Sequence, residues 1–69
     1  MIEVFSTNVQ KATEAKSLLA LLAQHFPDHK INFDLDDCDK ILRVEGKVVH
    51  AESVVGLVNE TGFACVVLV

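Results

Sequence analysis

The chain has 69 residues, of which 51% are hydrophobic and 23% are charged, and this balance excludes an intrinsically disordered segment. A chain of this length forms one domain, residues 1–69, and buries only about 60% of the surface that its unfolded form exposes. A formal net charge of −4, scattered Lys and Arg residues and the absence of Trp and Tyr exclude an extended nucleic-acid-binding surface.

Targeting and redox features of the sequence predict a cytoplasmic protein. The first residues, MIEVFSTN, place a charge at the third position and lack the basic-then-apolar order of a secretory signal. No apolar run reaches the length of a membrane span, so we expect no membrane partner. Cys38 and Cys65 lie far apart in the sequence, which favours two free thiols in a reducing compartment; the spacing also allows a disulfide between them.

A strand and a helix are the first two elements that the sequence predicts. Residues 2–7, IEVFST, are rich in β-forming side chains and alternate with a period of two. Residues 12–26 carry apolar side chains at the spacing of one helical face, and Pro27 ends the predicted helix. The apolar positions of this face are Ala12, Ala15, Leu18, Leu19, Leu22 and Phe26.

Residues 30–36 and 40–46 predict two strands joined by a tight turn. The first of them, KINFDLD, alternates apolar with polar residues, and the second, KILRVEG, places Leu42 and Val44 on one face. Between them lies DDCD, and aspartates favour tight turns because the short carboxylate accepts hydrogen bonds from nearby backbone N–H groups. The sequence therefore predicts a β-hairpin here.

The last two predicted elements are a second helix and a final strand. Residues 50–62, HAESVVGLVNETG, carry apolar residues at near-helical spacing and end at Gly62, a common helix stop. The stretch FACVVLV at residues 63–69 is a β-branched strand that is apolar on both faces. The order β-α-β-β-α-β predicts an α+β, ferredoxin-like fold with a four-stranded antiparallel sheet and two helices on one face.

This order of elements, together with three short stretches, resembles the heavy-metal-associated domain family of small copper chaperones and metal-ATPase modules. In that family a strand leads into a Gly-Met-x-Cys-x-x-Cys loop and an apolar-spaced helix, and a second helix ends in Gly-Tyr or Gly-Phe. Here the spacing of Ala15, Leu18 and Leu22 fits the first helix, ETGF at residues 60–63 fits the later signature, and INFDL lies where the family has its second strand. The resemblance covers essentially the whole chain.

The copper-binding loop of that family has no counterpart in this chain. When the loop is aligned with NVQKATEA, the two cysteine positions fall on Lys11 and Glu14. Cu(I) prefers soft thiolates, and a protonated lysine has no lone pair for a metal. We therefore expect no copper delivery here, no cofactor, and a solvated pair of Lys11 and Glu14.

The aspartate-rich turn gives a calcium hypothesis that the sequence itself weakens. Asp34, Asp36 and Glu45 fall at the first, third and twelfth positions of an EF-hand loop. The sixth position, which needs glycine, is Asp39, and the flanking segments read as strands instead of helices. We therefore expect an exposed turn.

Histidines offer a second metal hypothesis. In a ferredoxin-like fold the end of the first helix, the start of the second strand and the end of the third strand share one pole, which brings His25, His29 and His50 to the same end. Three imidazoles could bind zinc or nickel there, with three solvated loop histidines as the alternative. Cys38, at the opposite pole, is a further candidate for a relocated metal site.

The sequence contains no recognisable catalytic arrangement. Cys38 is expected to be an exposed thiol, but the surrounding aspartates stabilise its protonated form, which opposes a nucleophilic role. Cys65 alternates with apolar neighbours and is expected to pack as a small hydrophobe. Glycine-rich phosphate loops and Ser-His-Asp patterns are also missing, so we expect no enzyme.

One face of the predicted sheet is left open and is the candidate interaction surface. On it we place Phe5, Thr7, Asn32, Asp34, Ile41, Arg43 and one set of side chains from the final strand, with Val67 among the candidates. The resulting hypothesis is a protein-interaction module that binds an unknown protein or self-associates through this face. The rival hypothesis is a metal-ion carrier or sensor with its site at the histidine pole or at Cys38.

Overall fold

A computed structural model describes residues 1–68 of the chain and contains the six predicted elements in the predicted order. In chain order they are β1 (Ile2–Thr7), α1 (Ala12–His25), β2 (Lys30–Asp34), β3 (Ile41–Glu45), α2 (Ala51–Glu60) and β4 (Cys65–Val67). Each observed element lies within two residues of its expected ends, and β4 is the one that is shortened at both ends by that amount.

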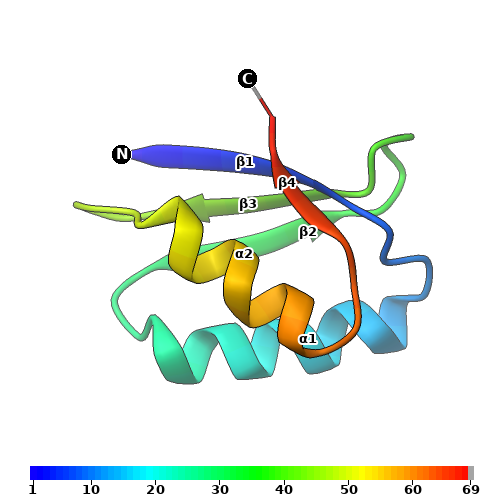
Figure 1. Ribbon diagram of the computed structural model, residues 1–69, viewed down its shortest axis with the longest axis horizontal. Helices are drawn as coiled ribbons and strands as arrows, with labels where there is room; N and C mark the ends of the chain where they lie inside the picture. The colour runs from blue at the N-terminus through cyan, green and yellow to red at the C-terminus, as the bar shows by residue number, and fades with distance from the viewer. Residues whose placement is uncertain (69) are drawn as a thin grey trace.

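The strands form one antiparallel sheet in the order β2-β3-β1-β4, and the predicted α+β fold class is confirmed. β1 is therefore an inner strand, paired with β3 on one side and with β4 on the other. Figure 1 shows α1 and α2 packed on the sheet, and β4, which pairs with β1, leads to the C-terminal end of the chain. The arrangement is consistent with a ferredoxin-like fold, and it leaves the second face of the sheet without a covering layer.

Helix α1 begins and ends where local chemistry predicts. The Glu14 carboxylate accepts backbone N–H groups at the start of the helix, and an acidic group there also suits the positive end of the helix dipole. At the other end the Phe26 N–H still donates to the Leu22 carbonyl, and Pro27 prevents continuation. Ala15, Leu18 and Leu22 form the buried stripe.

Helix α2 is shorter and ends at a glycine in a left-handed conformation. Gly62 has φ +97 and its N–H donates to the Asn59 carbonyl, as expected for a helix that ends in this way. Val54 and Val58 are its buried residues. Within residues 1–68, neither helix combines the length and the hydrophobicity that crossing a bilayer would need.

The core lies between the helices and one face of the sheet. A single cluster of buried side chains joins three strands, the segment before α2 and both helices. Its members are Phe5, Leu22, Leu42, Val44, Val49, Val54, Val58 and Cys65. A smaller cluster of Val9, Ala15 and Leu18 extends it below the loop between β1 and α1.

The expected orientation of β1 was wrong. Phe5 and Thr7, which the sequence analysis placed on the open face, are fully buried and 9% exposed respectively. Phe5 lies opposite Leu42 of β3 in the sheet, so it shares the helix-covered face with that core residue. The physical reason is size, because burying the phenylalanine ring removes more apolar surface from water than burying Ile2 or Val4.

Candidate functional site

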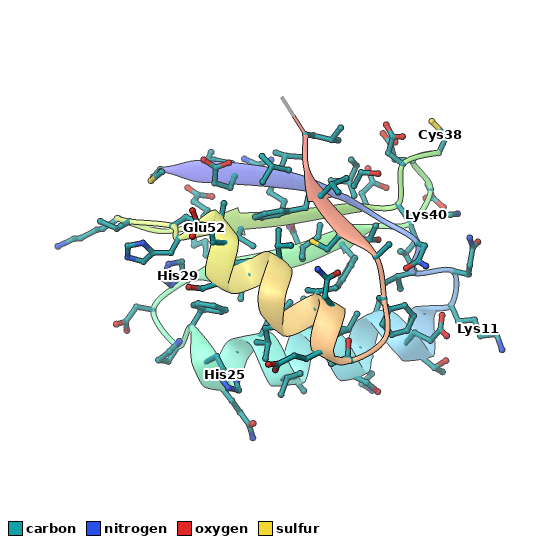
Figure 2. All side chains as sticks on the ribbon, in the orientation of Figure 1. Lys11, His25, His29, Cys38, Lys40 and Glu52 are labelled. Carbon is teal, nitrogen blue, oxygen red and sulfur yellow. The ribbon has the colours of Figure 1, made fainter. Side chains whose placement is uncertain are left out.

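The loop between β1 and α1, where the heavy-metal-associated family holds its metal, is a capped helix start in this protein. Glu14 Oε1 accepts the N–H of Lys11 at 3.1 Å and that of Gln10 at 3.3 Å. The carboxylate thus caps the backbone at the start of α1. Lys11 is exposed and lies at one end of the molecule (Figure 2). These two side chains offer no soft ligand.

The aspartate-rich segment between β2 and β3 is the turn of a hairpin, as predicted. Asp34 and Asp37 each accept the backbone N–H two residues ahead, at 3.3 Å and 2.9 Å, which is the local bonding that makes aspartate a turn residue. The Lys40 N–H donates to the Asp37 carbonyl at 3.0 Å, and Lys40 itself has φ +48. Glu45 pairs with Lys30 at the far end of the same hairpin, well away from the turn.

Strand β1 holds this turn in place through a buried hydroxyl. Thr7 Oγ1 donates to the Lys40 carbonyl at 2.6 Å and accepts the Val9 N–H at 3.3 Å, while the Thr7 N–H donates to the Asp39 carbonyl at 3.0 Å. Ser6 adds a longer, exposed bond to Asp39. This role was not predicted, because nothing local in IEVFST distinguishes a buried threonine from an exposed one.

One group of possible metal ligands exists among residues 1–68, and it lies in this turn. Ligand atoms of Asp37, Cys38 and Asp39 all lie within 4.8 Å of one another, and all three residues are exposed. The set mixes two hard carboxylates with one soft thiol, and the Asp37 carboxylate already accepts the Asp39 N–H. Exposed acidic turns of this kind are common without a metal.

The three histidines do not form one ligand set. His25 and His29 lie at the end opposite Cys38 and Lys11, as the fold predicted (Figure 2). However, His25 Nδ1 bonds to the Leu21 carbonyl of its own helix at 3.1 Å, and His29 Nε2 bonds to the Val48 carbonyl at 2.7 Å. The zinc or nickel hypothesis for His25, His29 and His50 has no support in this geometry, because their ring nitrogens do not all lie within 4.8 Å of one another.

His29 instead acts as a structural bridge between two loops. Because a carbonyl can only accept, Nε2 carries the hydrogen that bonds to Val48. The ring packs edge-on against Phe26, with 5.6 Å between centroids, and a Cβ added at Gly46 would lie 2.6 Å from it. Its Nδ1 is buried without a hydrogen-bond partner, the one such side-chain atom among residues 1–68. The histidine thus connects the start of β2 with the segment between β3 and α2.

The two cysteines are free and occupy different environments. Cys38 is exposed in the turn, and Cys65 is buried in β4, so the predicted pair of free thiols is observed. Burial raises the pKa of the Cys65 thiol from 9.0 to about 11, because the thiolate would lose its hydration. Cys65 is therefore an inert core residue at neutral pH.

The open face of the sheet divides into two halves of different chemistry. On β2 and β3 it carries the polar side chains of Asn32, Asp34 and Arg43, which border a hollow of about 360 Å³. On β1 and β4 it carries Ile2, Val4, Val66 and Leu68, a set that we call the apolar strip. The strip contains no charge and is well exposed, at 47% for Ile2, 61% for Val66 and 39% for Leu68.

Four of the seven residues that were predicted to lie on this face do so, among them Asn32 and Asp34 of β2. Ile41 and Arg43 do, because they alternate with the buried Leu42 along β3. Phe5 and Val67 do not: they lie opposite each other in the β1–β4 ladder and therefore share the helix-covered side. The apolar strip replaces them, and the absence of charge throughout FACVVLV was the sequence signal that pointed to it.

The two edge strands of the sheet also differ. β2 carries Lys30 and Asp34 at its ends, and charges on an edge strand discourage pairing with another chain. β4 has no charged residue, and neither does the stretch on either side of it from Phe63 to Leu68. The β4 edge and the adjacent apolar strip together form the candidate functional site.

Comparisons with protein-family models, with curated proteins and with solved structures find no match to this chain.

Proposed function

We propose that the protein is a small protein-interaction module, built on a fold like that of heavy-metal-associated domains, which binds an uncharged, apolar protein surface through the apolar strip. The observation that carries this proposal is the exposure of Ile2, Val66 and Leu68 on the same open face of β1 and β4, with Leu68 opposite Val4 and next to an unprotected sheet edge. Exposed apolar patches on small proteins frequently mark partner surfaces.

The chemistry at the start of α1 supports a binding role over metal delivery. Lys11 and Glu14 stand where the family has its cysteines, and the Glu14 carboxylate is engaged in capping the helix. A catalytic role has no support either, because the buried Cys65 has a raised pKa and the exposed Cys38 has only aspartates beside it. We propose a module that is not an enzyme and has no cofactor.

We also propose that the protein acts in the cytoplasm. Cys38 is an exposed free thiol and Cys65 a buried one, an arrangement that suits a reducing compartment. The net charge of −4 and the scattered basic residues argue against nucleic acid as a partner.

Matched variants of the two halves of the open face test the interaction proposal. Val66→Lys adds a charge to the apolar strip, and Asn32→Lys adds the same charge to the exposed β2 side of that face. Partners captured from an extract of the source cells, then purified, are expected to bind wild type and Asn32→Lys alike and to bind Val66→Lys at least about tenfold more weakly. If every captured partner binds all three proteins equally, and none self-associates, the proposal is wrong.

The second candidate is a metal carrier or sensor with a relocated site, and one observation favours the turn as its place. The ligand atoms of Asp37, Cys38 and Asp39 lie close enough to contact one ion. Titration with Cu(I), Zn(II) and Ni(II) separates this candidate from the interaction module. A carrier binds at least one ion stoichiometrically with a dissociation constant below about 1 μM. Cys38→Ser should abolish that binding, whereas a site at the histidine pole would survive this change.

A further inference from the structure

The free edge of β4 has hydrogen-bonding groups that nothing in residues 1–68 engages. The Leu68 N–H donates to the Val4 carbonyl and the Ala64 N–H to Asn8 Oδ1, so the even-numbered residues of this segment direct their backbone groups toward β1. In an antiparallel ladder alternate residues point to opposite sides. The N–H and C=O groups of Cys65 and Val67 therefore point outward from the sheet.

We propose that a second copy of this chain pairs with that edge, β4 against β4 and antiparallel, to form one continuous sheet across a two-fold axis. The inference rests on the proposed function and names its partner: the uncharged surface that is bound is the β4 edge of another copy, where Val66 of one apolar strip meets Val66 of the other. Strand addition at a free edge is an established mode of protein recognition. In a two-fold arrangement the same edge of both copies forms the interface, so the outward backbone groups of both β4 strands are bonded at once.

The register of the pair follows from the outward groups. Cys65 of one copy exchanges both of its backbone bonds with Val67 of the other copy, and the reverse pair does the same, which makes about four hydrogen bonds. This register uses every outward group of β4 and needs no residue beyond it. It places Val66 on the axis, opposite Val66 of the second copy, with Cα atoms about 4.5 Å apart.

Charge favours a second copy at this place and nowhere else on the sheet. Each chain carries a formal charge of −4, so two copies repel one another at most orientations. The segment from Phe63 to Leu68 and the β1 side of the apolar strip are free of charge, whereas the β2 edge carries Lys30 and Asp34. Two like-charged chains therefore approach with least repulsion at β4.

Area sets the strength of the dimer. Stable complexes bury about 800 Å² on each partner, which would be nearly a fifth of the 4476 Å² that this chain exposes. The three-residue strand Cys65–Val67 and the strip beside it cover less than that. We therefore expect reversible association with a dissociation constant of about 10–100 μM, weaker than that of standard-size interfaces.

Opposite charges at Val66 test the register directly. Wild type is expected to dimerise in sedimentation velocity runs at increasing concentration. Val66→Lys and Val66→Glu each place two like charges on the axis and are expected to dimerise at least about tenfold more weakly. An equal mixture of the two variants places opposite charges there and should recover dimer. Recovery also shows that both variants are folded, because only a paired β4 brings the two side chains together.

A proline variant tests the backbone bonds apart from the side chains. Val67→Pro removes an outward N–H that bonds to nothing within one chain, and proline is tolerated at such edge positions. It should abolish dimerisation while the circular dichroism spectrum stays that of wild type. The control, Asn32→Lys on the polar half of the open face, should dimerise like wild type. Added salt should strengthen the dimer, because it screens the repulsion between two acidic chains.

The outcomes separate this inference from the proposed function. A wild-type protein that stays monomeric at about 1 mM overturns the inference, and so does a dimer that Val67→Pro and the Val66 variants leave intact. A monomer that still binds another protein in a Val66-dependent manner overturns the inference alone and retains the interaction module. A monomer with no such partner overturns both. A dimer that obeys the charge-pair and proline tests supports both.

Discussion

The two faces of the sheet carry apolar residues of the same kinds but use them differently. On the covered face Phe5, Leu42 and Val44 are completely buried beneath the helices. On the open face Ile2 and Val66 are 47% and 61% exposed. Hydrophobicity alone therefore does not identify the core of this protein. Apolar residues in excess of what two helices can cover remain exposed, and in a chain of 69 residues that excess is available for a partner.

The comparison also explains why the candidate site lies on β1 and β4. These two strands supply side chains to both faces, with Phe5 and Cys65 inward and Val4 and Val66 outward. β2 and β3 place the polar Asn32, Asp34 and Arg43 on the open face beside the apolar Ile41. Neighbouring residues of one strand face opposite sides of the sheet, so substitutions at such neighbours compare the covered face with the open face directly.

The largest expected effect on the free energy of unfolding comes from shortening side chains on the two faces of β1, first Phe5 on the covered face and then Val4 on the open face. Phe5→Ala should lower the free energy of unfolding by about 3–5 kcal/mol, close to the whole stability of a domain this small, and Phe5→Leu by about 1–2 kcal/mol. Val4→Ala, on the open face, should cost less than about 1 kcal/mol. Urea denaturation measures all three. Equal costs for Val4→Ala and Phe5→Ala would contradict the observed orientation of β1.

Thr7 and Ser6, two neighbouring hydroxyl residues of β1, should give the next largest difference in stability. Thr7→Val keeps the shape of the side chain but removes the hydroxyl that bonds to Lys40 and Val9, so buried backbone groups lose their partner. The cost should be about 1–3 kcal/mol. Ser6→Ala removes only an exposed bond and should cost a few tenths of a kcal/mol. A thermal unfolding series checks the order, and similar shifts for both variants would count against the buried role of Thr7.

Two glycines, Gly46 after β3 and Gly56 within α2, give the next contrast, because only the first has a neighbour in the way of a new Cβ. Gly46→Ala pushes a methyl group into the His29 ring and should cost about 1–2 kcal/mol. The same change in a His29→Ala background should cost much less, which a double-mutant cycle measures. Gly56→Ala, where the new Cβ meets open space within α2, should stabilise by about 0.5–1 kcal/mol. An unchanged cost of Gly46→Ala without the ring would show that His29 is not the obstacle.

The smallest expected effect is the dependence of the free energy of unfolding on pH that the buried Cys65 thiol causes. Its folded pKa of about 11 lies above the ordinary 9.0, so between these values the folded state holds a proton that the unfolded state has lost. The free energy of unfolding should therefore fall as pH rises from 9 to 11. Cys65→Ala should show a flatter decline over this range, which urea denaturation at a series of pH values measures. Identical slopes for wild type and Cys65→Ala would refute the assignment.

Local patterns were sufficient to predict every element of this fold. Helix α1 follows from its apolar spacing and from Pro27, and α2 from its valines and Gly62. The hairpin turn follows from aspartates that bond to the backbone two residues ahead. These signals lie within a few residues of the feature they determine, which is why sequence reasoning found them.

The candidate site was only partly predictable. The alternation along β3 placed Arg43 correctly on the open face, and the absence of charge in FACVVLV pointed to the final strand without deciding which of its side chains face outward. Phe5 and Val67 were assigned to the wrong face, and the metal hypothesis for the histidine trio found no support in the geometry. Those errors arose because the positions of these residues depend on contacts between segments far apart in the sequence. Examples are the bond from His29 to Val48 and the pairing of Phe5 with Val67.

The sequence by itself determined the order of strands and helices and the absence of thiolates at the start of α1, because periodicity, turn residues and ligand chemistry are local properties. Only the tertiary structure decided which side of β1 is buried and which edge of the sheet is free. In a strand that is apolar on both sides, the register with its neighbours and the positions of the helices select the buried face. That selection turned Phe5 inward and left Val66 facing outward on the open face beside an unpaired strand edge.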